Sequence, residues 1–411
     1  MHSFTPPREN NRRKLLLSTG ISWLFDAMDV GMLSFIVAAL ALEWNLGSQQ
    51  IGLLTAINSI GMVVGAAVAG SLADQYGRRA VLLWTLVLFS AASGLSALAG
   101  SFAMLCVLRF FAGFGLGGEL PVASTLVSES VPARDRGRTV VLLESFWAAG
   151  WIASALIAYF VIPQYGWRTA FVIGALPALY AFYLRRAVED SPRYLNQRGR
   201  KPSFGERFAS VWSPAYRTST VTLWILWFAV VFSYYGMFLW LPTVIVMKGF
   251  DLVKSFGYVL VMTLAQLPGY FTAAYLIETF GRKFVLVAYL LLTAASALWF
   301  GSAETIGGIV GAGVCLSFFN LGAWGAMYAY TPELYPTSIR STGVGFASSF
   351  GRVGGVIGPF LVGALVARGT GIAAVFYVFF AAIVIGALVL LAFGKETKGT
   401  DPDRTDGAVA G

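Results

Sequence analysis

The sequence predicts an all-α polytopic membrane protein with 12 transmembrane helices in two six-helix halves. Three observations predict this fold: the composition, twelve long apolar stretches and an internal repeat. Of the 411 residues, 57% are hydrophobic and only 12% charged, against about 25% charged residues in soluble domains, and the mean hydropathy is +0.72. With one histidine and two cysteines, the chain lacks the ligands of a typical zinc site. We expect no cofactor, no metal and no enzymatic activity.

Stretches of about 20 mostly apolar residues are long enough to cross a bilayer as a helix. They occupy residues 15–42, 51–72, 80–100, 102–124, 138–162, 167–187, 218–247, 252–280, 284–302, 305–331, 341–367 and 371–394. The first stretch is longer than the apolar region of a signal peptide, so we expect it to be retained.

The basic residues predict the orientation, because Lys and Arg concentrate on the cytoplasmic side of membrane proteins. With a cytoplasmic N-terminus, only Arg168, Lys248, Lys254 and Arg368 of the 29 basic residues fall outside, and two more lie within helices. We therefore expect both termini to be cytoplasmic. The net charge of +9 follows from this topology, and we expect no nucleic-acid partner.

The polar stretch 188–217 divides the chain in the middle. It predicts an N-terminal half at 1–187, a cytoplasmic linker at 188–217, a C-terminal half at 218–394 and a cytoplasmic tail at 395–411. The two halves share charged motifs at a constant offset of 204 residues: Asp74, Gly77, Arg78, Arg79, Glu129, Pro132 and Arg136 correspond to Glu278, Gly281, Arg282, Lys283, Glu333, Pro336 and Arg340. A constant offset across two motifs indicates duplication, which is the architecture of alternating-access transporters.

The segment Gly70-Ser-Leu-Ala-Asp74-Gln-Tyr-Gly77-Arg78-Arg79 resembles the signature loop between helices two and three of the major facilitator superfamily. The resemblance extends over essentially the whole chain and implies the major facilitator fold. Paired cytoplasmic charges can join the halves in one conformation and separate in the other. We therefore predict a gating role for Asp74, Arg78, Arg79, Glu129, Arg136, Glu278, Arg282, Glu333 and Arg340. The alternative is that the arginines only fix the topology.

Six charged residues lie inside predicted helices: Asp26, Asp29, Arg109, Glu119, Glu144 and Arg352. A charge at the bilayer centre costs about 2.5–3.5 kcal/mol, so each one is a functional candidate. None of the six recurs at the 204-residue offset, which separates them from the repeated gating motifs. Because the chain has no histidine in its apolar stretches, the buried carboxyl groups are the candidate proton carriers.

Asp26 and Asp29 are three residues apart and therefore share one face of the first helix. We predict that these aspartates, with Glu119, Glu144 and Arg109, couple transport to protons. Two alternatives remain: one aspartate orders helix packing or neutralises Arg109, and the glutamates form a structural network with Arg109.

Arg352 lies in the glycine-rich run Ser348-Ser-Phe-Gly-Arg-Val-Gly-Gly355. Room around a planar guanidinium suits bidentate binding of a carboxylate, although pairing with an acid of the other half is the competing interpretation. Aromatic residues accompany polar positions at Trp147, Tyr234 and Tyr235, while Asn320, Trp324 and Tyr328 follow one another on a single helix face. An arginine with aromatic neighbours suits a flat aromatic carboxylate.

The runs Ser22–Phe35, Gly117–Ala123 and Leu142–Trp147 resemble the bacterial niacin permeases. Asp190–Arg193 and Glu333–Thr337 resemble the related organic ion transporters and synaptic vesicle glycoproteins. These resemblances imply anion binding by Arg352 and a ligand pocket lined by Trp147, Tyr234, Tyr235 and Trp324. The vesicle proteins carry an aspartate where this chain has Tyr328, so their ligand chemistry does not transfer to that position.

The sequence as a whole favours a monomeric proton-coupled importer of nicotinate, and of nicotinamide as a further candidate. A proton symporter for benzoate-like acids is the alternative within this class, and a non-transporting receptor is the alternative outside it. Facilitated uptake without proton coupling also stays open. An aspartyl enzyme using Asp26 and Asp29 needs carboxylates that face each other across a site, which one helix does not provide. No phosphate-binding Gly-x-x-x-x-Gly-Lys-Ser/Thr motif indicates an ATP-driven pump.

Overall fold

The protein is described by a computed structural model that covers residues 9–76, 78–130, 136–180, 183, 204–336 and 339–398. Every regular element within these ranges is an α-helix. The chain divides into two compact units, Met1–Arg198 with Leu239–Leu260 and Gly199–Phe238 with Val261–Gly411. The predicted boundaries of the two halves and their linker stay predictions.

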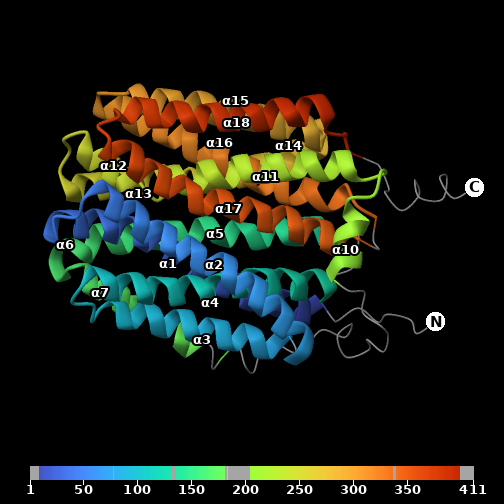
Figure 1. The fold of residues 1–411 in the computed structure, drawn as a ribbon, viewed down its shortest axis with the longest axis horizontal. Coiled ribbons are helices and arrows are strands. Elements are labelled where there is room, and N and C mark those ends of the chain that lie inside the picture. The colour runs from blue at the N-terminus through green and yellow to red at the C-terminus, as the bar shows by residue number, and fades with distance from the viewer. Residues whose placement is uncertain are drawn as a thin grey trace, which may run out of the picture. The chain divides into compact units, whose positions relative to one another are not determined.

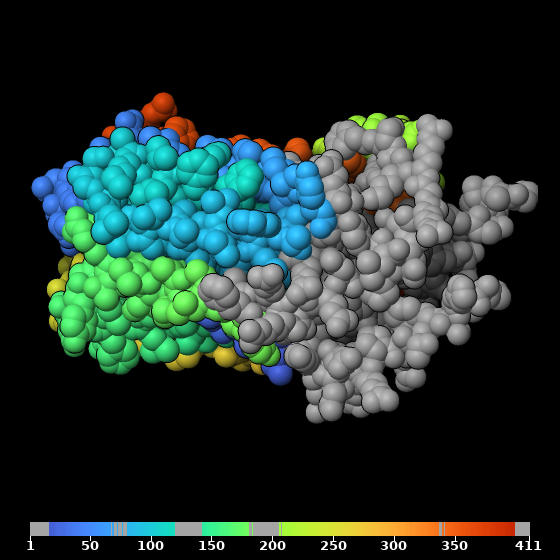
Figure 2. Space-filling model, turned by 90° about the horizontal axis from the view of Figure 1, so that it is seen from below, coloured from blue at the N-terminus to red at the C-terminus, as the bar shows by residue number. Residues whose placement is uncertain are grey.

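The first unit is built from long helices that pack in pairs. It contains α1 (Glu9–Glu43), α2 (Ser48–Tyr76), α3 (Arg78–Ser96), α4 (Phe102–Ser130), α5 (Arg136–Phe160), α6 (Ile162–Tyr165), α7 (Trp167–Ile173), α12 (Leu241–Met247) and the beginning of α13 (Leu252–Leu264). Helix α1 packs along α5, and α4 packs along α2 and α3 (Figure 1). Figure 2 shows one face of this unit, where α3 and α4 lie beside α5 and α7.

The second unit contains α10 (Phe204–Val211), α11 (Arg217–Phe238), α14 (Gln266–Phe280), α15 (Arg282–Ser302), α16 (Ile306–Glu333), α17 (Arg340–Ala367) and α18 (Ile372–Phe393). Helix α11 packs along α17 and α18, and α16 packs along α14 and α15. The short α10 holds Phe208 against Phe346 of α17, with ring centroids 5.4 Å apart. It therefore anchors the segment that precedes α11 to the second unit.

Ten helices in the described part of the chain are long and apolar enough to cross a membrane. A further apolar helix at Ala80–Ser96 is shorter, and the predicted stretch 167–187 lies partly outside the described residues. The predicted all-α polytopic membrane fold is confirmed.

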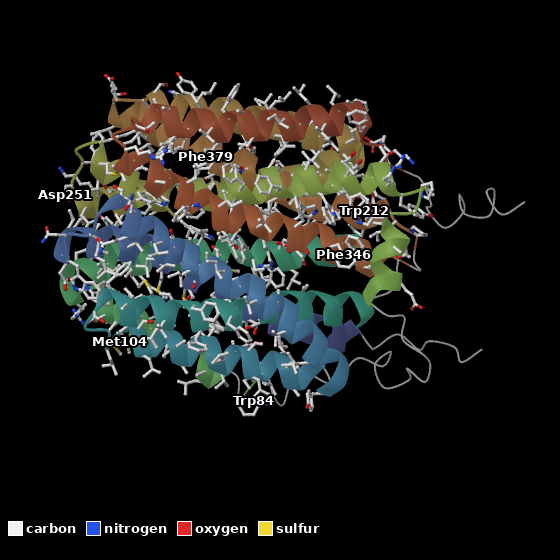
Figure 3. All side chains as sticks on the ribbon, in the orientation of Figure 1. Trp84, Met104, Trp212, Asp251, Phe346 and Phe379 are labelled. Carbon is white, nitrogen blue, oxygen red and sulfur yellow. The ribbon has the colours of Figure 1, made fainter. Side chains whose placement is uncertain are left out.

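The outer surface of the helices is apolar, whereas charged and polar groups lie inside. Trp84 is 74% exposed and points away from α3 (Figure 3). Leu98, which follows the C-terminal end of α3, and Tyr275 of α14 are similarly exposed. Large exposed apolar areas are unusual in soluble monomers, and here they form the surface that contacts lipid.

Glycines allow α2 and α4 to approach closely. A Cβ atom on Gly61 would lie 2.2 Å from the carbonyl oxygen of Phe110, and one on Gly113 would lie 2.0 Å from that of Asn58. Small residues provide this close packing in membranes, where the hydrophobic effect does not drive helices together. The α2–α4 contact holds in place the helix that carries Arg109 and Glu119.

Candidate functional site

Five charged side chains are buried in the first unit. Asp26 and Asp29 belong to α1, Arg109 and Glu119 to α4, and Glu144 to α5, and each is 1% exposed or less. Isolated charges at this burial are very costly, so they need polar partners. The structure assigns the two aspartates of α1 to different partners.

Asp29 forms an ion pair with Arg109. The Nη1 atom of Arg109 donates to Oδ2 of Asp29 at 3.2 Å, and Ser93 of α3 donates its hydroxyl to Oδ1. The remaining guanidinium donors reach the Ser96 hydroxyl oxygen, at 3.3 Å from Nε and 3.0 Å from Nη2. The guanidinium carbon also lies 4.6 Å from the ring centroid of Phe171. This group is neutral overall and its polar atoms are well satisfied.

Asp26 lies near a second carboxyl group. The Glu119 side chain of α4 is close to Asp26 and to Ser22, but neither of its oxygens makes a hydrogen bond within the described ranges. Two close carboxyl groups cannot readily both ionise in a buried site. Proton coupling by this Asp26–Glu119 pair stays a prediction.

Helix α5 brings Glu144 and Trp147 beside the same part of α1. A Cβ atom on Gly20 would meet the Phe146 ring, and one on Gly150 would lie 2.3 Å from the Leu24 carbonyl oxygen. Trp147 lies between these contacts and is therefore level with residues 20–24 of α1. The predicted site residues of α1, α4 and α5 thus come from helices of one unit.

The second unit contains an aromatic cluster between α11 and α16. The ring centroids of Tyr234 and Trp324 are 4.9 Å apart, and those of Trp324 and Tyr328 are 5.9 Å apart. Tyr235 lies edge-on to Tyr234 at 5.2 Å. Trp227 completes the cluster, 4.9 Å from Tyr328. Four predicted binding residues are therefore brought together in this unit.

Arg352 lies on α17, which packs against α11 through glycines. A Cβ atom on Gly351 would lie 3.1 Å from the Trp227 carbonyl oxygen, and one on Gly358 would lie 2.5 Å from that of Phe232. The Arg352 side chain is half-buried, and no carboxylate within the described ranges forms a salt bridge with it. Its predicted role in binding an anionic substrate stays a prediction.

The sequence-based selection missed three residues of the second unit. Trp227 lies seven residues before Tyr234, on the same face of α11, and this spacing could have identified it. Gln266 of α14 and Ser317 of α16 are completely buried and polar. A single amide or hydroxyl in an apolar stretch is a weaker signal than a charge, so the sequence alone did not single out Gln266 or Ser317.

The described residues of the predicted gating set form a cluster at the end of the second unit where α15 begins and α16 ends. Arg282 forms salt bridges with Glu278 at 2.8 Å and with Glu333 at 3.2 Å. Arg340 donates to the carbonyl oxygens of Pro332 and Tyr335. The side chains of Asp74, Arg78, Arg79, Glu129 and Arg136 lie outside the described part of the chain. Gating by the two repeats stays a prediction.

Residues after α18 close this cluster. Glu396 accepts hydrogen bonds from the backbone N–H groups of Arg282 and Lys283, the first residues of α15. Burial acts to raise the pKa of Glu396, but these N–H groups and those of Thr397 and Lys398 hold the pKa below its ordinary value. Thr397 donates its hydroxyl to Glu333 at 2.5 Å. The carboxylate thus caps the positive end of α15.

Residues 19–269 and 255–409 match the sequence profile of the Major Facilitator Superfamily. The chain belongs to this superfamily. Its fold is similar to that of the xylose transporter XylE of E. coli in a partially occluded inward-open conformation, with a TM-score of 0.78, 19% identity and coverage of 96% of this chain and 100% of that one. At this identity the likeness shows the shared fold.

Two bacterial members of the superfamily are more similar in sequence. The chain is 56% identical to the "Putative niacin/nicotinamide transporter NiaP" of Bacillus subtilis, over 95% of this chain and 98% of that protein. It is 44% identical to the "Niacin transporter NiaP" of Acinetobacter baylyi, over 94% of each. The synaptic vesicle 2-related protein of Xenopus laevis is 32% identical over 94% of this chain and 78% of its own length. The predicted branch of the superfamily is confirmed.

Proposed function

We propose that this chain is a secondary transporter that imports nicotinate, and nicotinamide as a further substrate, by alternating access. The observation that carries the proposal is the half-buried Arg352, which has no acidic partner in the described ranges. It lies on a helix packed against the one that bears Trp227, Tyr234 and Tyr235. The niacin transporters that are 56% and 44% identical support the choice of substrate.

Substrate recognition then divides into two tasks. The guanidinium of Arg352 offers paired N–H donors, which match the two oxygens of a carboxylate. The rings of Tyr234, Trp324 and Tyr328 offer faces and edges to a flat aromatic ring. Trp147 belongs to the first unit, and its part in substrate binding stays a prediction.

Proton coupling follows from the charge of the substrate. Importing an anion against an inside-negative potential costs about 2.3 kcal/mol per 100 mV. One accompanying proton makes the step electroneutral, and a second lets the membrane potential drive it.

Within the predicted proton-coupling set, the Asp26–Glu119 pair is the carrier and the Asp29–Arg109 pair is structural. Arg109 forms an ion pair with Asp29. Asp26 and Glu119 are two buried acids close to each other, and such a pair favours the protonated form of one of them. Glu144 supplies a further buried acid near α1.

Alternating access uses the repeated cytoplasmic charges. The Arg282 cluster and its counterpart at Asp74, Arg78 and Arg79 would form and release contacts as the halves move, as the duplication suggests. We place the transporter in the bacterial inner membrane as a monomer with both termini in the cytoplasm, because the basic residues concentrate on that side.

A benzoate-like acid is the second candidate substrate. Arg352 recognises a carboxylate and the aromatic cluster recognises a ring, and neither distinguishes a benzene from a pyridine. This alternative shares the proton-coupling residues and changes only the selectivity.

Uptake of labelled nicotinate into proteoliposomes under an imposed pH gradient tests the proposal. We expect gradient-driven accumulation in the wild type, loss of uptake in Arg352→Ala, and loss of the response to the gradient in Asp26→Asn. Uptake that ignores the gradient in the wild type would leave a facilitator. Absence of nicotinate uptake by folded protein, with uptake of benzoate, would assign the second substrate class.

A further inference from the structure

In the described part of the second unit, three non-aromatic side chains that are buried and polar have atoms without hydrogen-bond partners. They are both amide atoms of Gln266, the hydroxyl oxygen of Ser317 and the Oδ1 atom of Asn320. The exposed fraction is 0%, 0% and 1%, respectively. Nearly all buried polar atoms in folded proteins are hydrogen-bonded, and an unpaired one is costly. These atoms are therefore available for a polar group that enters the site.

The contacts between the helices bring Gln266 level with Ser317. Buried positions of α14 recur at Gln266, Gly269, Tyr270, Ala273 and Ile277, which form one face of the helix. This face meets α16, because a Cβ atom on Gly269 would lie 2.2 Å from the Phe318 carbonyl oxygen. Two turns before Gly269, a Cβ atom on Gly313 of α16 would meet Met262 of α13. Gln266 lies between these two contacts and is level with residues 315–317 of α16.

The polar side chains continue the aromatic cluster along α16. Ser317, Asn320, Trp324 and Tyr328 are spaced three, four and four residues apart, which places them on one helix face. Asn320 is about 6 Å along the axis from Trp324, and Ser317 is about 10 Å from it. The face therefore changes from aromatic to hydrogen-bonding over the length of a small aromatic molecule.

Arg352 lies at the aromatic end of this stripe. Gly351 contacts Trp227 and Gly355 contacts Val231 and Tyr235, so Arg352 is level with the stretch of α11 between Trp227 and Tyr234. The same stretch packs against Tyr328 and Trp324. The cation of Arg352, the aromatic rings and the unpaired polar side chains thus follow one another within the second unit.

We propose that Gln266, with Ser317 and Asn320, forms a hydrogen-bonding site for the ring nitrogen of a pyridine carboxylate. This inference rests on the proposed function and names the groups that choose between its two substrate classes. An unprotonated pyridine nitrogen is an acceptor, and the Gln266 amide supplies a donor. A benzene ring presents a C–H group at that position and leaves the amide unpaired. Sites that hydrogen-bond a substrate group reject the analogue without it.

The test measures dissociation constants for nicotinate and for benzoate in nanodiscs. Gln266→Met keeps the length of the side chain and removes its hydrogen-bonding groups. We expect the benzoate-to-nicotinate ratio of dissociation constants to fall about ten-fold, the effect of roughly one hydrogen bond. The ratio falls because the variant binds nicotinate more weakly, whereas its affinity for benzoate does not decrease. In the wild type, nicotinate should also bind more tightly than picolinate or isonicotinate, which hold the nitrogen elsewhere on the ring, and this preference should shrink in the variant.

Thr293→Val is the matched control. It removes a buried hydroxyl of α15 that donates to the Tyr289 carbonyl, and we expect no change in the ratio. Equal weakening of both ligands in Gln266→Met, or an unchanged ratio, would show that Gln266 serves structure alone and overturn the inference. If this variant does not fold, the same ratio of dissociation constants measured in Ser317→Ala tests the inference. We expect it to fall about three-fold. A wild type that binds benzoate and not nicotinate overturns the proposed substrate together with this inference, whereas an unchanged ratio overturns only the inference.

Discussion

The arginines of the two units have different surroundings. In the first unit, Arg109 forms an ion pair with Asp29 and donates to Ser96, and Ser93 donates to Asp29. In the second unit, the guanidinium of Arg352 has no acidic partner in the described ranges, and the Gln266 amide atoms are unpaired. Groups with internal partners can store a proton or fix a helix, whereas groups without partners are available to a ligand.

This contrast gives different expectations for substitutions of Arg109 and of Arg352. Removing Arg109 leaves a buried carboxylate without its counter-charge, so the fold itself is affected. In the proposed site, removing Arg352 takes away a ligand contact, and it leaves no unpaired acid behind among the described residues. Stability measurements and binding measurements should therefore separate the two units.

The largest expected effect is the loss of stability in Arg109→Leu. Breaking a buried ion pair by removing one partner costs about 3–5 kcal/mol, because Asp29 remains buried without compensation. Thermal unfolding of the detergent-solubilised protein measures it. The double variant Arg109→Leu/Asp29→Leu should recover most of the stability, since no charge is left unpaired. A single variant as stable as the wild type would contradict the structural role of this pair.

The next effect is the loss of nicotinate affinity in Arg352→Ala. Each hydrogen bond to a charged group contributes about 1.5–3 kcal/mol, so losing two should weaken binding about 100-fold or more. Equilibrium binding in nanodiscs measures it, and the melting temperature should change little. Arg352→Lys keeps the charge without the paired donors and should bind with intermediate affinity. Normal affinity in Arg352→Ala would remove this residue from the proposed site.

A third prediction concerns the Asp26–Glu119 pair. Asp26→Asn and Glu119→Gln each replace a titrating group with an amide that cannot release a proton, so nicotinate accumulation should lose its response to an imposed pH gradient. Counterflow of labelled for unlabelled nicotinate, which needs no net proton movement, should persist. Gradient-driven accumulation that survives in both variants would contradict the assignment of this pair as the carrier.

The smallest expected effect is at Glu396, outside the membrane-spanning helices. Its folded pKa is lowered, so its contribution to stability is present above the unfolded pKa and is lost as the pH falls through the folded value. Allowing for screening by solvent, we expect about 0.5 kcal/mol. The difference in stability between the wild type and Glu396→Gln should therefore shrink between pH 7 and pH values below about 4.5. A difference that does not vary with pH would contradict this account.

The membrane fold could be predicted from the sequence because helix length and apolar composition are local properties. A stretch such as 284–302 carries all the information needed to place α15 (Arg282–Ser302) within a few residues. The pairing of buried charges is not local. Asp29 and Arg109 are 80 residues apart, and their contact depends on how α1 packs against α4. The spacing of Asp26 and Asp29 indicated a shared face, but it could not indicate that each has a different partner.

The candidate site was predicted in part for the same reason. Charged and aromatic residues such as Arg352 and Trp324 are conspicuous in apolar stretches, so sequence alone selected them. Gln266 gives no such signal, because one amide among apolar residues is ordinary in a membrane helix. Only its burial and its unpaired atoms distinguish it.

The contact of Glu396 with α15 has a consequence for how the protein is made. Chains fold progressively from the N-terminus during synthesis, and residues 395–398 are made after every helix of the second unit. Until then, the N-terminal N–H groups of α15 lack the Glu396 carboxylate, and Glu333 lacks the Thr397 hydroxyl. The end of the second unit where α15 begins is therefore completed only after α18 has been made, and a chain truncated before Lys395 could not complete it.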